Sequence, residues 1–413
     1  MTETIFAADV AALDAADPLA PFRERFQLRE GLIYLDGNSL GALPKMTGDR
    51  LAEVIDTEWG EGLITSWLGA EWSTAPRRIG DKIGRLLGAK PGEIVAADST
   101  SVNIFKALTA ALSLRHERPV ILSEASNFPT DVYMMQGIEA FSGGRVKAVT
   151  VAPDAVLDAL NDDVAVLLLT QVHYKSGRVR DMAAITRAAH DAGALVVWDL
   201  SHSAGAIPVD LNGANADFAI GCGYKFLNGG PGAPAYLFAA SRHHAATPVL
   251  SGWFGHARPF AFEEDYDPAA GIERFQCGTP PMLGLSALEV GVDLMLEADM
   301  AEIRRKSLAL GDLFIEHMQP LCDTYGFKLA SVRDHAERGS QVAYAHPQGY
   351  QIVQALKEFD VIADFRAPDI LRFGLTPLYL SYRDILETVE RLETVCATRA
   401  WDKPQYHRRA AVT

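Results

Sequence analysis

The sequence predicts an α/β fold in which a mostly parallel sheet forms a large domain, followed by a smaller α+β domain. Between residues 93 and 200, short apolar runs rich in β-branched residues alternate with helical segments. A long helical stretch follows after about residue 282, and short β-rich runs return beyond it. Strands that alternate with helices imply parallel pairing, with helices on both faces of the sheet.

The elements can be assigned in order along the chain. Residues 8–26 have a helical pattern, and residues 46–89 are expected to form two helices, the second closed by Gly88. Between them, a short apolar strand runs into the turn region GLIYLDGNSLGALP. Because little helical pattern separates the last two sheet strands, we expect one of them to be antiparallel. The expected strands of the large sheet are 93–99, 119–126, 145–151, 164–172, 194–200, 217–223 and 232–240.

The domain boundaries follow from the long helical stretch, which is expected to connect the two domains. We expect an N-terminal segment at 1–45 associated with the small domain, a large domain at 46–290 and a small C-terminal domain at 291–413. The N-terminus lacks a basic region followed by an apolar core, and no stretch approaches the length of a transmembrane helix. We therefore expect neither export nor membrane anchoring.

Composition excludes several classes of partner and site. The 413 residues, 48% hydrophobic and 22% charged, are typical of a globular chain with one large or two moderate cores. The net charge of −15 argues against nucleic acid or an anionic membrane as a partner, since both favour clustered Lys and Arg. Four cysteines without CxxC or CxxH spacing indicate neither a metal site nor disulfides, and fit a reducing cytoplasm. They are Cys222, Cys277, Cys322 and Cys396.

Two residues at strand ends suggest the chemistry. Asp199 ends the apolar run ALVVWDL, where open α/β sheets bind ligands, although an Asp there can simply cap a turn. Lys225 follows the next β-rich run and is flanked by Tyr224 and a Gly/Pro-rich turn. A lone lysine is usually a solvated charge, but pyridoxal phosphate needs this pair: an amine to carry it and a carboxylate to keep its ring nitrogen protonated.

Two further segments fit the same cofactor. In ADSTSVNIF a strand end is followed by the hydroxyl residues Ser99, Thr100 and Ser101 and then by a helix, whose free amides and dipole favour a phosphate. Ordinary N-capping explains one hydroxyl more easily than three. In SNFPTD, Phe128 can stack on a ring and Asp131 can hydrogen-bond nearby groups, although a Phe before a Pro is often a packed turn.

The chain resembles the kynureninase family over nearly its whole length. Class V aminotransferases and cysteine desulfurases share the Asp, His and Lys spacing, but not the combination of YLDGNSLG, YKFLNGGPG and GWFGH. The resemblance implies a fold-type I pyridoxal-phosphate enzyme with a mostly parallel, seven-stranded sheet. The motifs that carry it are, in order, YLDGNSLG, STSVN, NFPTD, WDLSHSAGAIPVDL, GCGYKFLNGGPGAP, GWFGH, CGTPP and RFGLTPLY.

The resemblance also implies roles at the cofactor. Lys225 would carry pyridoxal 5'-phosphate as a Schiff base, and Asp199 would pair with the pyridine nitrogen. His202 would lie beside the ring, although alone it could be a structural hydrogen bonder. Because two of the implied contacts come from the neighbouring subunit, a homodimer with shared active sites is expected. The other implied contacts are Thr100, Ser101 and Tyr224 at the phosphate, Phe128, Asp131 and Thr170 around the ring, and Trp253 and Thr279 from the neighbouring subunit.

Substrate contacts follow from the same resemblance. Arg372 matches the arginine that binds the substrate's α-carboxylate, a task that suits a planar bidentate donor, and the RFGLTPLY context favours it over Arg366. Asn38 is a further substrate candidate, although turn formation explains it almost as well. Animal members carry histidine and asparagine where this chain has Trp67 and Thr279, so kynurenine is expected to be preferred over 3-hydroxykynurenine. Trp67 could instead be a core aromatic residue.

The implied activity is hydrolytic cleavage of the Cβ–Cγ bond of L-kynurenine to anthranilate and L-alanine in tryptophan degradation, with 3-hydroxykynurenine as a poorer substrate. Lys225 would move the Cα proton, and Tyr224 or water linked to Lys225 would act as acid and base at the γ-carbonyl. The alternatives are an aminotransferase, a cysteine desulfurase or a non-catalytic cofactor-binding protein. No cysteine has the mobile-loop setting of a desulfurase, and retention of Lys225, Asp199 and Arg372 argues against a non-catalytic protein.

Overall fold

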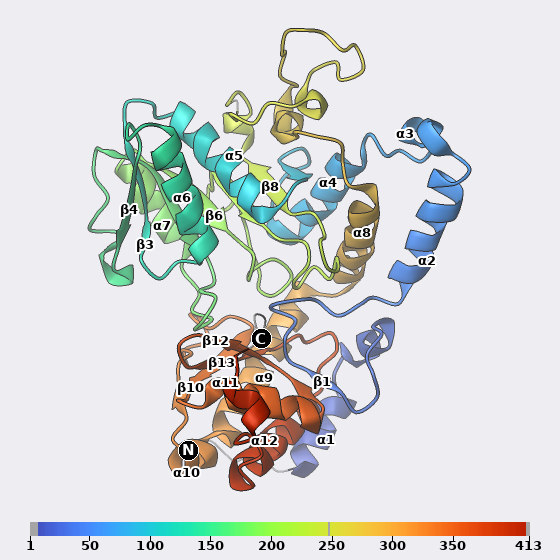
Figure 1. The fold of residues 1–413 in the computed structure, drawn as a ribbon, viewed down its shortest axis with the longest axis vertical. Coiled ribbons are helices and arrows are strands. Elements are labelled where there is room, and N and C mark those ends of the chain that lie inside the picture. The colour runs from blue at the N-terminus through green and yellow to red at the C-terminus, as the bar shows by residue number, and fades with distance from the viewer. Residues whose placement is uncertain (1–6, 247, 410–413) are drawn as a thin grey trace. The chain divides into compact units, whose positions relative to one another are not determined.

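The computed structural model describes residues 7–246 and 248–409, and the chain divides into two compact units, each with its own sheets (Figure 1). Within these described residues, no helix combines the length and the apolar character that crossing a bilayer requires. Unit 1 comprises Met1–Lys45, Tyr174–Val179 and Ala298–Thr413, and unit 2 comprises Met46–His173 and Arg180–Glu297.

Unit 2 is built on a seven-stranded sheet in the order β2-β8-β7-β6-β5-β3-β4. Neighbouring strands pair in parallel except at β8, which is antiparallel to both β2 and β7. The predicted mostly parallel sheet with one antiparallel strand is confirmed. The strands are β2 (Ile94–Ala96), β3 (Val120–Glu124), β4 (Lys147–Val151), β5 (Val164–Thr170), β6 (Leu195–Asp199), β7 (Phe218–Gly221) and β8 (Tyr236–Ala239).

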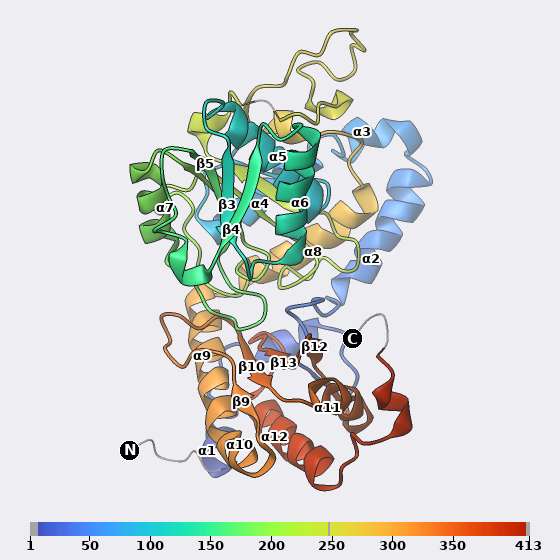
Figure 2. The same ribbon diagram turned by 60° about the vertical axis from the view of Figure 1, so that its left-hand side comes forward.

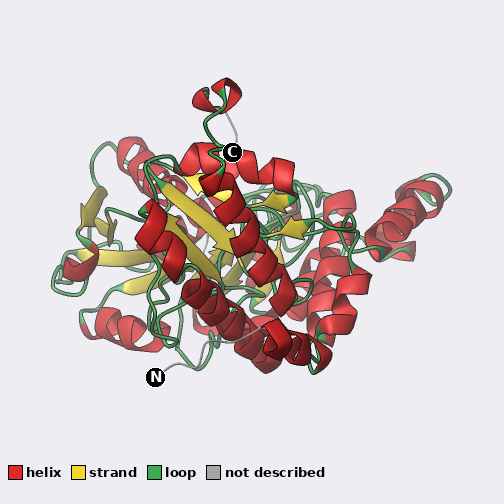
Figure 3. Cartoon of the chain, turned by 90° about the horizontal axis from the view of Figure 1, so that it is seen from below, coloured by secondary structure: helices red, strands yellow, loops and turns green. Residues whose placement is uncertain are grey.

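Helices cover this sheet, and Figures 2 and 3 show them around the strands. Every residue of β5 and β6 is buried, as expected for central strands covered on both faces. Apolar residues of α5 and α6, such as Leu108 and Met135, join the strands in one core cluster. The helices are α2 (Met46–Glu53), which continues as a π-helix to Trp59, α3 (Ser66–Gly69), α4 (Ala75–Leu87), α5 (Thr100–Ser113), α6 (Pro129–Phe141), α7 (Met182–Asp191) and α8 (Met282–Glu297).

Unit 1 contains a four-stranded antiparallel sheet in the order β12-β13-β10-β9 and a parallel pair formed by β1 and β11. Its strands are β1 (Ile33–Tyr34), β9 (Lys328–Leu329), β10 (Gln341–Ala345), β11 (Val361–Ile362), β12 (Asp364–Arg366) and β13 (Ile370–Gly374). Its α-helices are α1 (Ala7–Ala15), α9 (Met300–His317), α10 (Gln319–Tyr325), α11 (Gly349–Leu356) and α12 (Tyr382–Ala397).

Two expected helices are interrupted. The helix expected over 8–26 ends at Ala15, and a 3-10 helix follows at Ala20–Arg25, because Pro18 disfavours helical geometry at the residue before it. The long stretch after residue 282 divides into α8 and α9. Asp299 caps α9 by accepting a hydrogen bond from the backbone N–H of Ala301, which starts a new helix there.

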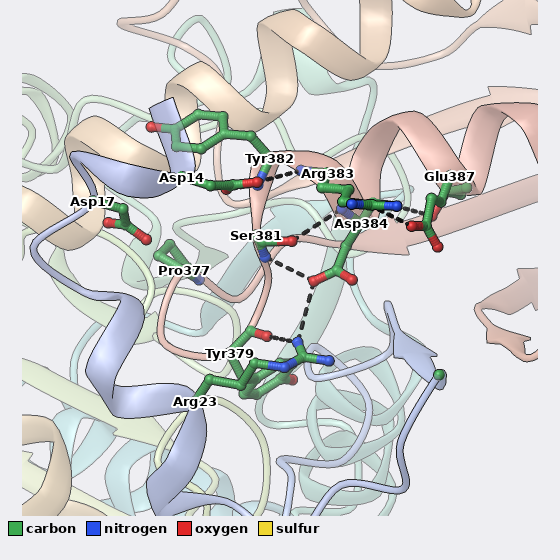
Figure 4. A network of polar contacts seen from close by, with 12 residues as sticks. Asp14, Asp17, Arg23, Pro377, Tyr379, Ser381, Tyr382, Arg383, Asp384 and Glu387 are labelled. Atoms are coloured by element: carbon green, nitrogen blue, oxygen red, sulfur yellow. Dashed lines mark hydrogen bonds and ion pairs between the residues drawn. The ribbon is translucent and has the colours of Figure 1, made fainter. Parts of the chain in front are cut away.

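The N-terminal segment is bound to the start of α12 inside unit 1 (Figure 4). Ser381 and Asp384 form a capping box, in which each side chain accepts a hydrogen bond from the other residue's backbone N–H. Asp14 accepts hydrogen bonds from the backbone N–H groups of Tyr382 and Arg383, at 2.7 and 3.1 Å. These contacts hold the first helix of the chain against the last long one.

Candidate active site

The carboxyl ends of three neighbouring strands in unit 2 gather the predicted cofactor residues. Thr170 ends β5 and is the register partner of Asp199, which ends β6. Asp199 in turn pairs with Ile220 of β7, and the loop after β7 carries Lys225. Parallel strands end at the same edge of a sheet, so Thr170, Asp199 and the loop that carries Lys225 lie at one edge.

Lys225 lies among aromatic rings and a histidine. Its Nζ is 3.1 Å from His202 Nε2 and 5.8 Å from the ring centroids of both Phe128 and Tyr224. The DLSHSAG turn that carries His202 packs directly on this loop. At Gly205 the backbone φ is +78°, and a Cβ atom would lie 3.0 Å from the carbonyl oxygen of Phe226, so a side chain would be strained on both counts.

Asp199 is a buried carboxylate close to this lysine. It is 2% exposed, and its Oδ1 accepts a hydrogen bond from the backbone N–H of Ser201 at 2.7 Å. Burial raises the pKa of the Asp199 carboxyl, whereas the hydrogen bonds from Ser201 and the charge of Lys225 act in the opposite direction. Because a buried carboxylate is stabilised by a cation, a protonated ring nitrogen is a fitting partner for it.

A second carboxyl group lies beside the first. Asp131, in the first turn of α6, is fully buried, and Thr170 Oγ1 donates to its Oδ2 at 3.4 Å. Its Oδ1 is buried without a hydrogen-bond partner in the described residues. Burial, followed by the charge of Asp199, raises the pKa of Asp131 well above its ordinary value. This orphaned acceptor and the excess of acidic groups fit a ligand that brings N–H or O–H donors.

The N-terminus of α5 supplies an anion site in the same unit. Ser99 is the N-cap, and Thr100 and Ser101 begin the helix. The first backbone N–H groups of a helix have no acceptor within it, and the helix dipole adds to their attraction for a dianion. Phosphate, ring nitrogen and aldehyde of pyridoxal phosphate therefore each find a suitable group: this helix start, Asp199 and Lys225.

Sequence reasoning missed Lys106, which supports the turn before α5. Its side chain is fully buried, and its Nζ contacts Asp98 Oδ2 at 2.7 Å and the backbone carbonyl of Phe275. Asp98, which immediately precedes Ser99, has a backbone φ of +53°, a conformation that non-glycine residues adopt at a cost. A lysine within the apolar run FKALTAAL was the available signal, because a buried lysine needs a paired carboxylate.

Trp67 and Trp253 meet in an aromatic cluster elsewhere in unit 2. Phe254 lies between them, with ring centroids 5.9 Å from Trp67 and 5.1 Å from Trp253. The GWFGH and CGTPP segments also touch, because the backbone N–H of Phe254 donates to the carbonyl of Cys277. At Gly252 a Cβ atom would lie 2.2 Å from that same carbonyl oxygen. The exposed Thr279 follows two residues after Cys277.

The predicted substrate residues Arg372 and Asn38 lie in unit 1, and as substrate contacts both stay predictions. Arg372 is 1% exposed and forms a bidentate ion pair with Asp364. Asn38 is fully buried and donates to Gln341 Oε1 at 3.1 Å. Arg366 also pairs with Asp364, but its side chain is 35% exposed. Arg366 and Arg372, the two candidates for binding the substrate's α-carboxylate, therefore share the carboxylate of Asp364.

A raised pKa at Asp36, beside this group, should make the stability of the protein depend on pH. Burial and the charge of Asp364 raise its pKa from 3.8 to about 7, against the opposing effects of Ser39, Arg372 and Arg366. The folded carboxyl therefore binds its proton more tightly than the unfolded one, so the unfolding free energy contributed by Asp36 falls as pH rises from about 4 to about 7.

Asp36→Asn should remove this fall. Thermal unfolding measured from pH 4 to 8 is expected to show a variant that gains stability relative to the unsubstituted protein as pH rises. Unfolding temperatures that differ by the same amount at every pH would contradict this prediction.

The chain is similar to known kynureninases over nearly its whole length. Residues 303–392 match the family model of the kynureninase C-terminal domain. The chain is 49% identical over 411 residues to a kynureninase of Burkholderia pseudomallei, and 47% identical to one of Pseudomonas fluorescens. Each alignment covers 98% of this chain and 99% of the relative.

Solved structures with low sequence identity share the fold. A cysteine desulfurase of Thermococcus onnurineus superposes with a TM-score of 0.76 at 18% identity, covering 92% of this chain and 98% of that one. A C-DES mutant with glycine covalently linked to its PLP cofactor superposes with a TM-score of 0.75 at 18% identity, covering 90% and 98%. The predicted fold-type I class is confirmed.

The full-length match at 49% identity decides the family, where the fold alone could not. It confirms the predicted enzyme class, a hydrolase that cleaves a carbon–carbon bond, and the predicted cofactor, pyridoxal 5'-phosphate. The chain belongs to the kynureninase family.

Proposed function

We propose that this enzyme cleaves the Cβ–Cγ bond of L-kynurenine by hydrolysis, yielding anthranilate and L-alanine, with pyridoxal 5'-phosphate held on Lys225. The observation that carries the proposal is the grouping of Lys225, His202, Asp199 and Asp131 at one edge of the unit 2 sheet. The full-length relatives named kynureninase support the substrate.

The cofactor, when bound, supplies an electron-accepting ring conjugated with the substrate's Cα. Asp199 would keep the ring nitrogen protonated, because a buried carboxylate favours a cation beside it. The start of α5, at Thr100 and Ser101, would hold the phosphate. Phe128 would cover a face of the ring, and Asp131 and Thr170 would hydrogen-bond around it.

Proton transfer is assigned to groups around Lys225. With its amine free, Lys225 would take the Cα proton. His202, 3.1 Å from Nζ, would orient the amine. Tyr224, whose ring centroid is 5.8 Å from Nζ, is our candidate for the acid that serves the γ-carbonyl, either directly or through water linked to Lys225.

Substrate selection is assigned to Arg372, Asn38 and Trp67. Arg372 would bind the α-carboxylate, since a charged N–H group makes a strong hydrogen bond with a carboxylate. Asn38 would add a polar contact. Trp67, held between Trp72 and Phe254 at centroid distances of 5.9 Å, offers ring surface where a histidine would offer a polar nitrogen. Unsubstituted kynurenine should therefore be preferred over 3-hydroxykynurenine.

We further propose that the enzyme is a homodimer in which Trp253 and Thr279 reach the partner's cofactor. Two parts of unit 2 project in Figure 1, the segment from α2 to α3 and the loop before residue 266. Both carry exposed large apolar side chains. On the segment from α2 to α3 these include Trp59, Ile64 and Leu68, at 57, 76 and 82% exposure, and on the loop before residue 266 Phe262 is 78% exposed. Apolar groups gathered in this way favour association. Light scattering that gives the mass of one chain would contradict the dimer.

A cytoplasmic location is proposed from the chemistry of the cysteines. All four are free, and burial raises the pKa of each thiol, to about 12 for Cys396. A reducing compartment keeps such thiols unpaired. Recovery of the native protein from a secreted fraction would contradict this location.

The same thiols argue against a cysteine desulfurase activity. That reaction requires a reactive thiolate, and a thiol with a raised pKa is protonated at neutral pH. Cys222, the cysteine nearest Lys225 in sequence, directly follows β7 and so lacks the mobile-loop setting of a desulfurase cysteine.

The test is turnover by the purified, cofactor-loaded enzyme. L-kynurenine and 3-hydroxykynurenine are incubated separately, and the aromatic product is followed by fluorescence together with alanine. We expect anthranilate and alanine in equal amounts, and a higher kcat/KM for kynurenine. Failure to cleave either substrate would refute the proposed function, and release of sulfide from cysteine would revive the desulfurase alternative.

A further inference from the structure

The guanidinium of Arg372 is almost fully used inside its own unit. Its Nε donates to Asp364 Oδ1 at 2.8 Å, and its Nη2 donates to Asp364 Oδ2 at 2.5 Å and to Ser39 Oγ at 2.8 Å. Its Nη1 donates to the backbone carbonyl of Tyr174 at 2.7 Å. A guanidinium has five N–H groups, so these four bonds leave one N–H, on Nη1, for a ligand.

Asp364 is the acceptor at the centre of this arrangement. It lies on β12 directly across from Arg372 on β13, and the two side chains are 2 and 1% exposed. Its Oδ2 also accepts from Ser39 Oγ at 2.9 Å and forms an ion pair with Arg366 Nη2 at 2.6 Å. Both carboxylate oxygens are therefore engaged, and Oδ2 has three polar neighbours. A bidentate pair of this kind sets the plane of the guanidinium as well as its charge.

Stability is a poor explanation for this pair. The desolvation cost of a buried ion pair can exceed the attraction between its charges. Replacing such a pair with apolar residues of similar volume often leaves the protein equally stable. Arg338 of the same unit provides a comparison: it is equally buried, yet its carboxylate partner, Asp312, is 47% exposed and contacts it through one nitrogen. In the pair of Asp364 with Arg372, both side chains are buried and two hydrogen bonds join them. Two hydrogen bonds fix the orientation of the guanidinium.

We propose that Asp364 is a positioning residue that orients Arg372, so that the remaining Nη1 N–H is directed to the substrate's α-carboxylate. The inference rests on the proposed function, in which Arg372 binds that carboxylate. The local charge agrees with it: Asp364 contacts two guanidinium groups, those of Arg372 and Arg366, so it neutralises only one of them. Asp36 lies nearby, but its pKa of about 7 means that it adds less than a full negative charge at neutral pH. Part of a positive charge therefore remains for an anion.

The test uses Asp364→Asn in the full-length, cofactor-loaded enzyme. Asparagine preserves the shape and one acceptor, but it loses the charge and the second acceptor that fixes Nη2. We expect KM for L-kynurenine to rise about 10-fold, in keeping with the effect of a misplaced binding group, and kcat to stay within about threefold. The visible absorbance of the bound cofactor should be unchanged.

An inhibitor pair separates orientation from general damage. The decarboxylated amine of kynurenine lacks the group that Arg372 would bind, so its inhibition constant should be the same for Asp364→Asn and the unsubstituted enzyme. A carboxylate-bearing analogue should bind the variant about 10-fold more weakly. Equal weakening of both inhibitors, or a normal KM, would overturn the proposal.

Three further variants complete the design. Asp312→Asn removes the carboxylate of the other buried arginine and should leave KM unchanged. Ser39→Ala removes no charge but loses the acceptor for Arg372 Nη2 and the hydrogen bond to Asp364. It should raise KM less than Asp364→Asn, and it replaces that variant if Asp364→Asn does not fold; a normal KM for Ser39→Ala would then overturn the proposal. If Arg372→Ala leaves KM unchanged, the carboxylate assignment itself fails. If Arg372→Ala raises KM and Asp364→Asn does not, only the positioning role fails.

Discussion

Lys225→Ala should abolish the visible absorbance of the bound cofactor and lower kcat by at least ~10²–10⁴-fold, the range expected when a positioned proton-transfer group is lost. Alanine has no amine to condense with the cofactor aldehyde, and it cannot accept the Cα proton. His202, which lies 3.1 Å from Lys225 Nζ, cannot replace a primary amine in the covalent step. Absorbance spectra and initial rates with L-kynurenine measure both losses.

Lys225→Arg is the matched control for charge. It preserves a cation among Phe128, Tyr224 and Asp199 but does not form the covalent bond, so it should resemble the alanine variant in activity. If either variant retained the visible absorbance and turned over at more than about a tenth of the original rate, Lys225 would not be the cofactor lysine.

Asp199→Asn should keep the cofactor attached but lower kcat by roughly 10²–10³-fold, the loss seen when one electrostatic contact to a developing charge is removed. An amide still accepts the hydrogen bond from Ser201, so the turn should persist. It cannot, however, stabilise a protonated ring nitrogen, and the ring then accepts electrons poorly. The absorbance of the bound cofactor and kcat are measured together.

Asp217→Asn provides a control with equal burial. Asp217 is fully buried and pairs with His190, Arg242 and His243, but it precedes β7, whereas Asp199 ends β6, so the two lie at opposite edges of the parallel strands. Its substitution should lower the unfolding temperature and leave kcat unchanged. Asp199→Asn with a normal kcat, or Asp217→Asn with the same kcat loss, would contradict the special role of Asp199.

The order of elements in unit 2 was predictable because alternation between strand and helix is a local pattern. The antiparallel strand β8 was predictable for the same reason, since too few residues separate it from β7 for a helical crossover. The interruption near Pro18 and the break at Asp299 were missed. Each depends on one or two residues within a longer helical pattern, and such residues change the pattern little.

The sequence suggested the proposed cofactor residues through their places at strand ends, whereas the proposed substrate residues followed only from the family resemblance. Asp199 and Lys225 each follow a buried strand, and strand ends are visible in sequence. Lys106 and Asp364 were missed because a buried charged residue can be recognised only once its partner is known. The partner of Lys106 is Asp98, 8 residues away, and the partner of Asp364 is Arg372, across a hairpin. Arg366 and Arg372 could not be separated by composition, because both are arginines of one hairpin.

The sequence by itself determined the α/β class and the family motifs, and it suggested Lys225 and Asp199 as the residues that would hold the cofactor. Only the tertiary structure decided which buried charges face one another. It put Asp131 next to Asp199 with an unpaired oxygen, and it joined Arg372 to Asp364 through both carboxylate oxygens. The physical reason is that helices and strands follow from neighbours along the chain, whereas the partner of a buried charge is set by strand register and packing between distant segments.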